Sequence, residues 1–165
     1  MRKVILASLL LGLTSCGSSP TPATAARDFL QALQSFDIPR ATSYMHSDAS
    51  ISLVETAMDE PYTSAVRKAL WNRMTFEIPE VAASDQKETK VPAKIKIVDM
   101  ASVGDKIIAQ KDMSPEFIVD QINSPSADMR EETIVFLMKN EGDSWKIANS
   151  EDFELEKLLG GLGGL

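Results

Sequence analysis

Two residue types that often carry chemistry occur once each in this chain, as Cys16 and His46. A thiolate can act as a nucleophile, and an imidazole can act as a general base near neutral pH. With one cysteine and one histidine in 165 residues, an intramolecular disulfide and a Cys-rich zinc site are excluded by counting. What either residue can do is therefore decided by its neighbours in the sequence.

Cys16 follows a segment with the pattern of a secretory signal peptide. Arg2-Lys3 is a short basic region, and an apolar run of ten residues follows from Val4 to Leu13. This length fits the apolar region of a signal peptide, whereas a membrane-spanning helix needs about 20 residues. The small residues Ser15 and Cys16 then come where a signal peptidase would cut. We therefore predict that residues 1–15 are a signal peptide.

The motif Leu13-Thr14-Ser15-Cys16 resembles a bacterial lipobox. The resemblance implies that Cys16 is acylated, with a palmitate-type chain, and becomes the mature N-terminus. It also implies an anchor on the extracytoplasmic side of the cell envelope. In a two-membrane bacterium the outer membrane is expected, because Gly17 is not the Asp that usually marks inner-membrane retention; otherwise the plasma membrane is expected. The alternative is an ordinary secretory signal in which the cysteine is incidental.

Composition places a short tether and one domain after this anchor. Residues 16–22 are predicted to be the lipidated cysteine and a small, polar, Pro-bearing tether, which spans roughly 20 Å when fully extended. Residues 23–157 are then predicted to form a single domain, because the chain is long enough for one hydrophobic core. Residues 158–165, which alternate leucine with glycine, are predicted to be a flexible tail.

Hydrophobic spacing predicts helices in the first half of this domain. Apolar residues recur at helical intervals after helix start signals, which are a capping residue or a proline in the first turn. The predicted helices begin at Thr21-Pro22, at Asp37 to Pro39, more weakly over Ser50 to Met58, and at Asp59-Glu60-Pro61. In the last of these, Tyr62, Val66, Ala69 and Leu70 share one side.

The second half of the domain changes to the alternating pattern of strands. Strands are predicted over Met74 to Ile78, Val91 to Ile97, Thr133 to Lys139 and Trp145 to Asn149, with a turn at Asn140 to Asp143. Between Asp99 and Ser124 the spacing is helical again, in two pieces separated near Asp112. The predicted class is α+β, with N-terminal helices packed on a curved antiparallel sheet. Its predicted core holds Phe29, Leu33, Ile95, Ile97, Phe136 and Trp145.

Three stretches resemble the cone-shaped, cystatin-like domain shared by nuclear transport factor two, ketosteroid isomerases and many small bacterial lipoproteins of unknown function. They are Ala26 to Leu33, Lys94 to Asp99 and Gly142 to Ile147. The resemblance implies the fold. It implies no particular activity, because this fold hosts both enzymes and catalytically inert modules.

No residue is assigned a catalytic role. A ketosteroid-isomerase-like mechanism needs an Asp base and a Tyr or neutral carboxyl donor, but the two tyrosines, Tyr44 and Tyr62, fall at expected core positions. Asp28 and Asp37 are explained by solvation and helix capping. His46 is expected at the surface, without a partner, where a short helix ends.

The sequence also lacks the usual patterns for metals, nucleotides and nucleic acids. The acidic pairs Asp59-Glu60, Glu131-Glu132 and Glu151-Asp152 do not have calcium-loop spacing, and there is no G-x-S-x-G, H-E-x-x-H or phosphate-binding glycine loop. A net charge of −7 disfavours duplex nucleic acid. No cofactor or metal is predicted. Trp71, beside the basic residues Arg67, Lys68 and Arg73, is expected to pack in the core, the alternative being contact with a partner or lipid headgroups.

Two functional classes remain, and a structural stalk or accessory subunit is kept as a third. The first is a non-enzymatic envelope lipoprotein, held by membrane lipid through Cys16, whose domain binds a small apolar ligand in its concavity or a neighbouring envelope protein. The alternative is a cavity enzyme of the isomerase or dehydratase type with an Asp or Glu base. A cavity lined by apolar side chains favours the first class, and a desolvated carboxylate facing a tyrosine favours the second.

Overall fold

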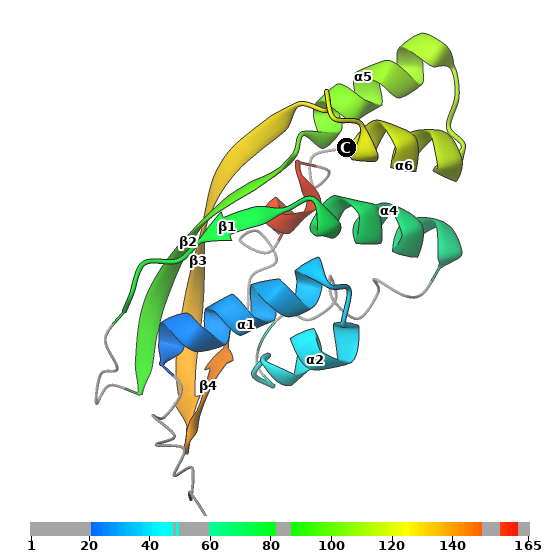
Figure 1. Ribbon diagram of the computed structural model, residues 1–165. Helices are drawn as coiled ribbons and strands as arrows, with labels where there is room; N and C mark the ends of the chain where they lie inside the picture. Colours follow the sequence, from blue (N-terminus) through cyan, green and yellow to red (C-terminus); the bar gives the residue numbers. More distant parts are fainter. Residues whose placement is uncertain (1–20, 48, 50–59, 82–86, 150–155, 162–165) are drawn as a thin grey trace, which may run out of the picture.

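The computed structural model describes residues 21–47, 49, 60–81, 87–149 and 156–161. In chain order, its elements are the helices α1 (Pro22–Gln34), α2 (Ile38–Ser43) and α4 (Pro61–Asn72), the strands β1 (Thr75–Glu77) and β2 (Glu88–Val98), the helices α5 (Met100–Gln110) and α6 (Pro115–Asn123), the strands β3 (Met129–Glu141) and β4 (Ser144–Ile147), and the short 3₁₀ helix η2 (Lys157–Leu159). Helices and a curved antiparallel sheet together confirm the predicted α+β class (Figure 1).

The helices begin where the sequence supplies capping groups. The Thr21 side chain accepts a hydrogen bond from the Thr24 N–H, and the Asp37 side chain accepts one from the Arg40 N–H. Ser114 does the same for α6 through the Phe117 N–H. These caps satisfy N–H groups that have no partner within the first turn of a helix. The predicted helix over Ser50 to Met58 lies outside the described residues.

The sheet is an antiparallel meander in the order β1-β2-β3-β4. Its centre is the pair β2 and β3, joined over the whole of β2 from Glu88↔Lys139 to Val98↔Met129, which is a length of roughly 35 Å. From residue 90 to residue 97 of β2 burial alternates, with Val91, Ala93, Ile95 and Ile97 buried and Lys94 and Lys96 exposed. This alternation leaves one face of the sheet for the core and the other for solvent.

The core lies between α1 and the concave side of the sheet (Figure 1). The rings of Phe29 on α1 and Phe136 on β3 meet edge to face, with centroids 5.8 Å apart. All six predicted core residues are buried in this one cluster, as the sequence predicted. Side chains from α1 therefore fill the space in which a ligand of the concavity had been expected.

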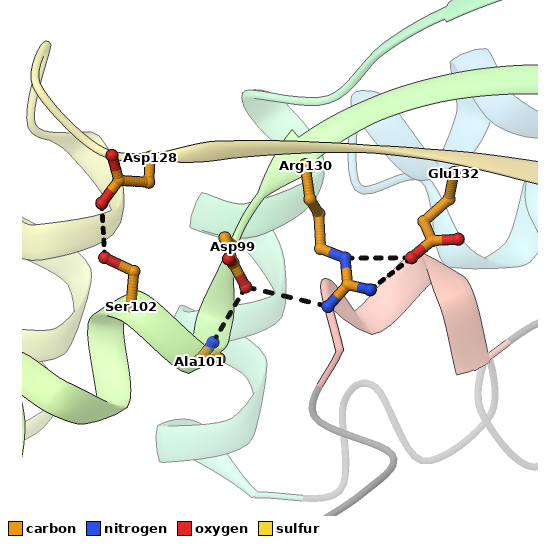
Figure 2. A network of polar contacts seen from close by, with 6 residues as sticks. All are labelled: Asp99, Ala101, Ser102, Asp128, Arg130 and Glu132. Carbon is orange, nitrogen blue, oxygen red and sulfur yellow. Dashed lines mark hydrogen bonds and ion pairs between the residues drawn. The ribbon is translucent and has the colours of Figure 1, made fainter.

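The helices α5 and α6 replace a tight turn between β2 and β3. Figure 2 shows the polar network where this helical insertion meets the sheet. Asp99 caps α5 by accepting from the Ala101 N–H, and its own N–H donates to the Asp128 carbonyl at 2.9 Å. The Arg130 guanidinium donates to Glu132 at 3.0 Å and lies 3.7 Å from Asp99. These bonds fix the start of α5 relative to the start of β3.

The prediction of a flexible tail from Leu158 is wrong for residues 158–161. Leu158 is fully buried, and its carbonyl accepts a hydrogen bond from the Trp71 indole at 2.9 Å. Gly160 has φ +62°, and a Cβ there would lie 2.3 Å from the Val98 carbonyl oxygen. Glycine at this position therefore allows close packing of the chain against β2. Residues 162–165 lie outside the described residues.

Two smaller predictions also need correction. β3 runs on to Glu141, so the turn before β4 consists of Gly142-Asp143 and not of Asn140 to Asp143. The Gly142 φ of +69° suits the first central position of a two-residue hairpin turn. Tyr62 is 42% exposed, although Val66, Ala69 and Leu70 on the same helix are buried as predicted.

Candidate ligand-binding cleft

The residues predicted to carry lipid, Leu13, Thr14, Ser15 and Cys16, lie outside the described part of the chain. Lipid attachment at Cys16 therefore stays a prediction. Within the described ranges, none of the helices combines the length and apolarity that crossing a membrane requires.

His46 is not the unpartnered surface histidine that the sequence predicted. Its side chain is only 15% exposed, and its Nε2 lies 2.9 Å from Glu141 Oε1 at the end of β3. Its backbone N–H donates to the Ile147 carbonyl at 2.7 Å, beside a parallel bridge between Met45 and Ile147. The polar residues after α2 predict a solvent-exposed segment. In the structure this segment instead lies beside β4, through the contacts of Met45 and His46 with Ile147.

The aspartates considered at first have ordinary structural contacts. Asp37 caps α2, as predicted. Asp28 accepts a hydrogen bond from the Tyr44 hydroxyl at 3.3 Å, which brings a carboxylate and a phenol together. The side chains of Asp28 and Tyr44 are half-buried, and neither lines any of the hollows described below.

Buried polar groups in the described residues are few and paired. Asn149 is the one buried polar or charged residue there, and its amide continues the sheet by accepting from the Leu137 N–H and donating to the Val135 carbonyl, both at 2.9 Å. Over the same residues, His, Cys, Asp and Glu form no group of three or more that could hold a metal ion. The Asn149 amide thus satisfies backbone groups at the edge of the sheet.

An apolar cleft of about 280 Å³ lies between α4, α5 and α6. Its lining residues come from three helices and from η2: Tyr62, Thr63, Val66, Arg67 and Leu70 of α4, Met100, Gly104 and Ile107 of α5, Ile118 of α6, and Leu159. Their spacing of three and four residues places them on one face of each helix. The cleft is therefore a direct product of the helical pattern in these segments.

Neighbouring contacts hold the walls of the cleft in place. The Arg73 guanidinium, at the end of α4, donates to the carbonyls of Ile122 at 2.6 Å and Ser124 at 2.5 Å, at the end of α6. Trp71 is fully buried and ties α4 to η2 through its indole N–H. The expectation that Trp71 packs in the core is confirmed. Of its basic neighbours, Lys68 is exposed and Arg67 lines the cleft.

Gly104 leaves a gap in the α5 wall. Glycine inside a helix is less stable than alanine by about 1 kcal/mol, so it usually serves a turn or a close contact. Here φ is not positive, and a Cβ added to Gly104 would meet no atom within 4 Å. Gly104 shares its helix face with Met100 and Ile107, which line the same cleft. Packing within the described protein therefore does not explain this glycine, whereas a bound ligand close to the helix backbone would.

Exposed apolar side chains gather at the same end of the molecule. Ile108, at the end of α5, is 75% exposed, and Met113, in the loop before α6, is 76% exposed. Together with Tyr62 they are the large hydrophobic residues exposed in the described part of the chain. Exposed apolar surface beside a cleft is typical of binding sites.

A larger hollow of about 480 Å³ lies at the β1 side of the sheet, but its lining is different. Most of its lining is charged or polar, and it consists of Thr75, Phe76, Glu77, Lys94, Ile95, Lys96, Glu131, Glu132 and Thr133. Lys96 pairs directly with Glu131 across the strands, so opposite charges stand side by side on this face. A solvated sheet face explains these residues, and we take the smaller, apolar cleft as the candidate site.

One sequence feature indicates the α5 wall of this cleft. It is Gly104, a glycine within the helical pattern of Met100 to Ile107. Arg67 was recognised only as part of a basic helix face. The meeting of α4 with α5 and α6 depends on tertiary packing across 30 or more residues and has no local signature.

Comparison with known proteins gives little further information. No family model matches the chain, and no curated protein matches it. Among solved structures, YcdA of Bacillus subtilis, described as a candidate lipoprotein, aligns with a TM-score of 0.40 and 15% identity. The alignment covers 81% of this chain and 44% of YcdA, so this chain spans less than half of that protein's length. A similarity this weak supports no conclusion about fold or function. Membership of the nuclear transport factor two superfamily therefore stays a prediction.

Proposed function

We propose that this protein is a lipid-anchored protein of the bacterial cell envelope whose domain binds a small apolar ligand in the cleft between α4, α5 and α6, without catalysing a reaction. The observation that carries the ligand-binding role is the gap at Gly104 in an otherwise apolar wall. The anchor is supported by the lipobox-like motif that ends at Cys16.

A non-catalytic role is supported by the chemistry of the lining. The polar groups that the described residues bring to it are the hydroxyls of Tyr62 and Thr63 and the guanidinium of Arg67. None of these is a carboxylate or an imidazole, the usual general bases near neutral pH. The cleft therefore offers binding and orientation to a ligand rather than proton transfer.

The arrangement of the fold supports access to the cleft from the aqueous side. Five residues separate Cys16 from Pro22, where α1 begins, so the start of α1 would lie close to the lipid surface. In Figure 1, α1 starts near the β4 end of the sheet, and α5 and α6 lie at the opposite end. The long β2–β3 pair would hold the cleft away from the membrane.

Ligand binding is tested by what copurifies with the full chain from envelope preparations. Native mass spectrometry should find an additional small-molecule mass on the unaltered protein and none on Gly104→Leu, because a leucine would occupy the gap. Ala109→Leu adds the same side chain on an exposed position of α5 and should keep the ligand. A ligand retained by Gly104→Leu, or absent from all three proteins, would refute the proposal.

The anchor is tested separately with Cys16→Ser. We expect this variant to remain unprocessed or to leave the membrane fraction, because the acyl acceptor is gone. Unchanged detergent partitioning, together with no acyl mass on the N-terminal peptide of the unaltered protein, would contradict lipid attachment.

A further inference from the structure

We propose that the ligand of this cleft is an amphipathic anion with a single apolar chain, whose headgroup lies at Arg67 and whose chain lies against Gly104. This inference rests on the proposed ligand-binding function and adds the chemical class of the ligand. It is carried by the placement of one cation and one glycine among apolar lining residues.

Arg67 supplies the selectivity for charge. Among the described residues that line the cleft it is the one that carries a charge, in a chain whose net charge is −7. An anionic ligand would therefore be repelled by most of the protein and attracted at this point. Arg67 is half-buried and already has a contact within the protein. Its guanidinium carries five N–H donors, so a ligand carboxylate can join that contact in a bidentate arrangement.

Two hydroxyl groups extend the polar mouth of the cleft. Tyr62 and Thr63 precede Arg67 on α4 by five and four residues, so Thr63 lies one turn from Arg67 on the same face. The Tyr62 side chain is 42% exposed, which places its ring between the lining and solvent. A headgroup at this position would keep contact with water while its chain enters the cleft.

The apolar part of the cleft fits one chain. The side chains of Val66, Leu70, Ile107 and Ile118 form its walls, and the gap at Gly104 lets a ligand approach the α5 backbone. A volume of about 280 Å³ is at the lower limit of small-molecule sites, which span roughly 300–1,000 Å³. This excludes a lipid with several acyl chains held entirely inside, and it favours a short fatty-acid-like molecule.

Residues 17–165 are the suitable protein for a binding experiment. The buried core runs from Ala25 to Leu158 and includes side chains from α1, α4, β2, β3 and β4. Residues 17–165 retain every residue of this core that the structure describes. Omitting residues 1–16 also avoids the acyl chain of the anchor, which would compete with a probe.

Isothermal titration calorimetry with octanoate, 1-octanol and octylammonium separates the headgroup from the chain. We expect octanoate to bind about tenfold more tightly than 1-octanol, and octylammonium to bind more weakly than 1-octanol. Arg67→Gln should lower the affinity for octanoate to that for 1-octanol, which removes the preference for the anion. Lys68→Gln, the exposed neighbour on α4, should leave octanoate binding unchanged. Arg67→Lys keeps the charge and should retain part of the preference for octanoate. This second variant keeps the test decisive if Arg67→Gln does not fold.

The outcomes distinguish this inference from the function on which it rests. Equal affinities for the three probes, or an octanoate preference that survives in Arg67→Gln, would overturn the assignment of an anionic ligand and leave apolar binding intact. Failure of all three probes to bind would overturn the proposed function itself. A preference for octanoate that depends on Arg67 and not on Lys68 supports the inference.

Discussion

The two ends of the long β2–β3 pair differ in how completely they are closed. At the β4 end, α1 covers the sheet and α2 packs on α1. Phe29 packs on Phe136, and polar groups such as His46 and Glu141 are paired. At the other end, α5 and α6 extend beyond the strands and leave an apolar cleft with Ile108 and Met113 exposed nearby. Both ends belong to one core cluster, but one end is packed and the other retains space.

This difference shows how one domain can combine stability with binding. Buried aromatic rings and paired polar groups at the β4 end supply a stable scaffold. The helical end is less tightly packed, most clearly at Gly104, which has no side chain and beside which no described residue fills the space. Functional sites commonly carry such local losses of stability, which the remainder of the fold compensates.

The largest effect on stability is expected at the packed end. Phe136→Ala should lower the free energy of unfolding by about 3–5 kcal/mol, because a fully buried ring that touches Phe29 is removed. Urea unfolding followed by circular dichroism measures this change. Leu137→Ala, on the half-exposed opposite face of β3, is the matched control and should cost clearly less. Equal losses for the two variants would contradict the assignment of inner and outer sheet faces.

The next effect is expected at Gly160, where the C-terminal segment packs on β2. Gly160→Ala should destabilise the protein by about 1–3 kcal/mol, because alanine is strained at φ +62° and its Cβ would meet the Val98 carbonyl. Thermal unfolding measures the loss. A neutral substitution would mean that residues 158–161 are not packed as described.

Gly104→Ala should have the opposite sign and a smaller size. We expect stabilisation of about 0.5–1 kcal/mol, since alanine is the better helix former and its Cβ meets nothing within 4 Å. The same denaturation experiment compares it with Gly160→Ala. Destabilisation by Gly104→Ala would show that the gap at the cleft wall is smaller than the structure indicates.

The smallest effect concerns the loop between α5 and α6. Hydrogen bonds from the Ser114 side chain and backbone N–H lower the pKa of Asp112 below its ordinary value of 3.8. The lowered pKa stabilises the folded protein at pH values above the ordinary pKa of 3.8. This stabilisation is lost as the pH falls through the lowered pKa of the folded protein. NMR titration should show the shift, and Ser114→Ala should move the midpoint upward. The control Ser126→Ala should leave the titration midpoint of Asp112 unchanged. An Asp112 pKa at its ordinary value in the unaltered protein would show that this loop is less ordered than the packed end.

The packed end was largely predictable from the sequence, and the cleft was not. Alternation along Val91 to Ile97 and the apolar stripe around Phe29 and Leu33 carry strong periodic signals, and the six predicted core residues are buried together. Leu158 and Gly160 were misjudged, because a leucine–glycine pattern indicates fraying unless tertiary packing is known. His46 was misjudged for the same reason, since its partner Glu141 is distant in sequence. The cleft depends on how three separate helices meet, which local patterns do not encode.

Methyl NMR of residues 17–165 during addition of 1-octanol compares the two ends directly and tests the central claim that the helical end is the binding site. Resonances of Ile107 and Ile118 in the cleft should shift in a saturable manner, and those of Ile134 and Ile147 in the packed sheet should not. In Gly104→Leu the shifts should disappear. Saturable shifts of Ile134 or Ile147, or unshifted Ile107 and Ile118 resonances, would contradict the account.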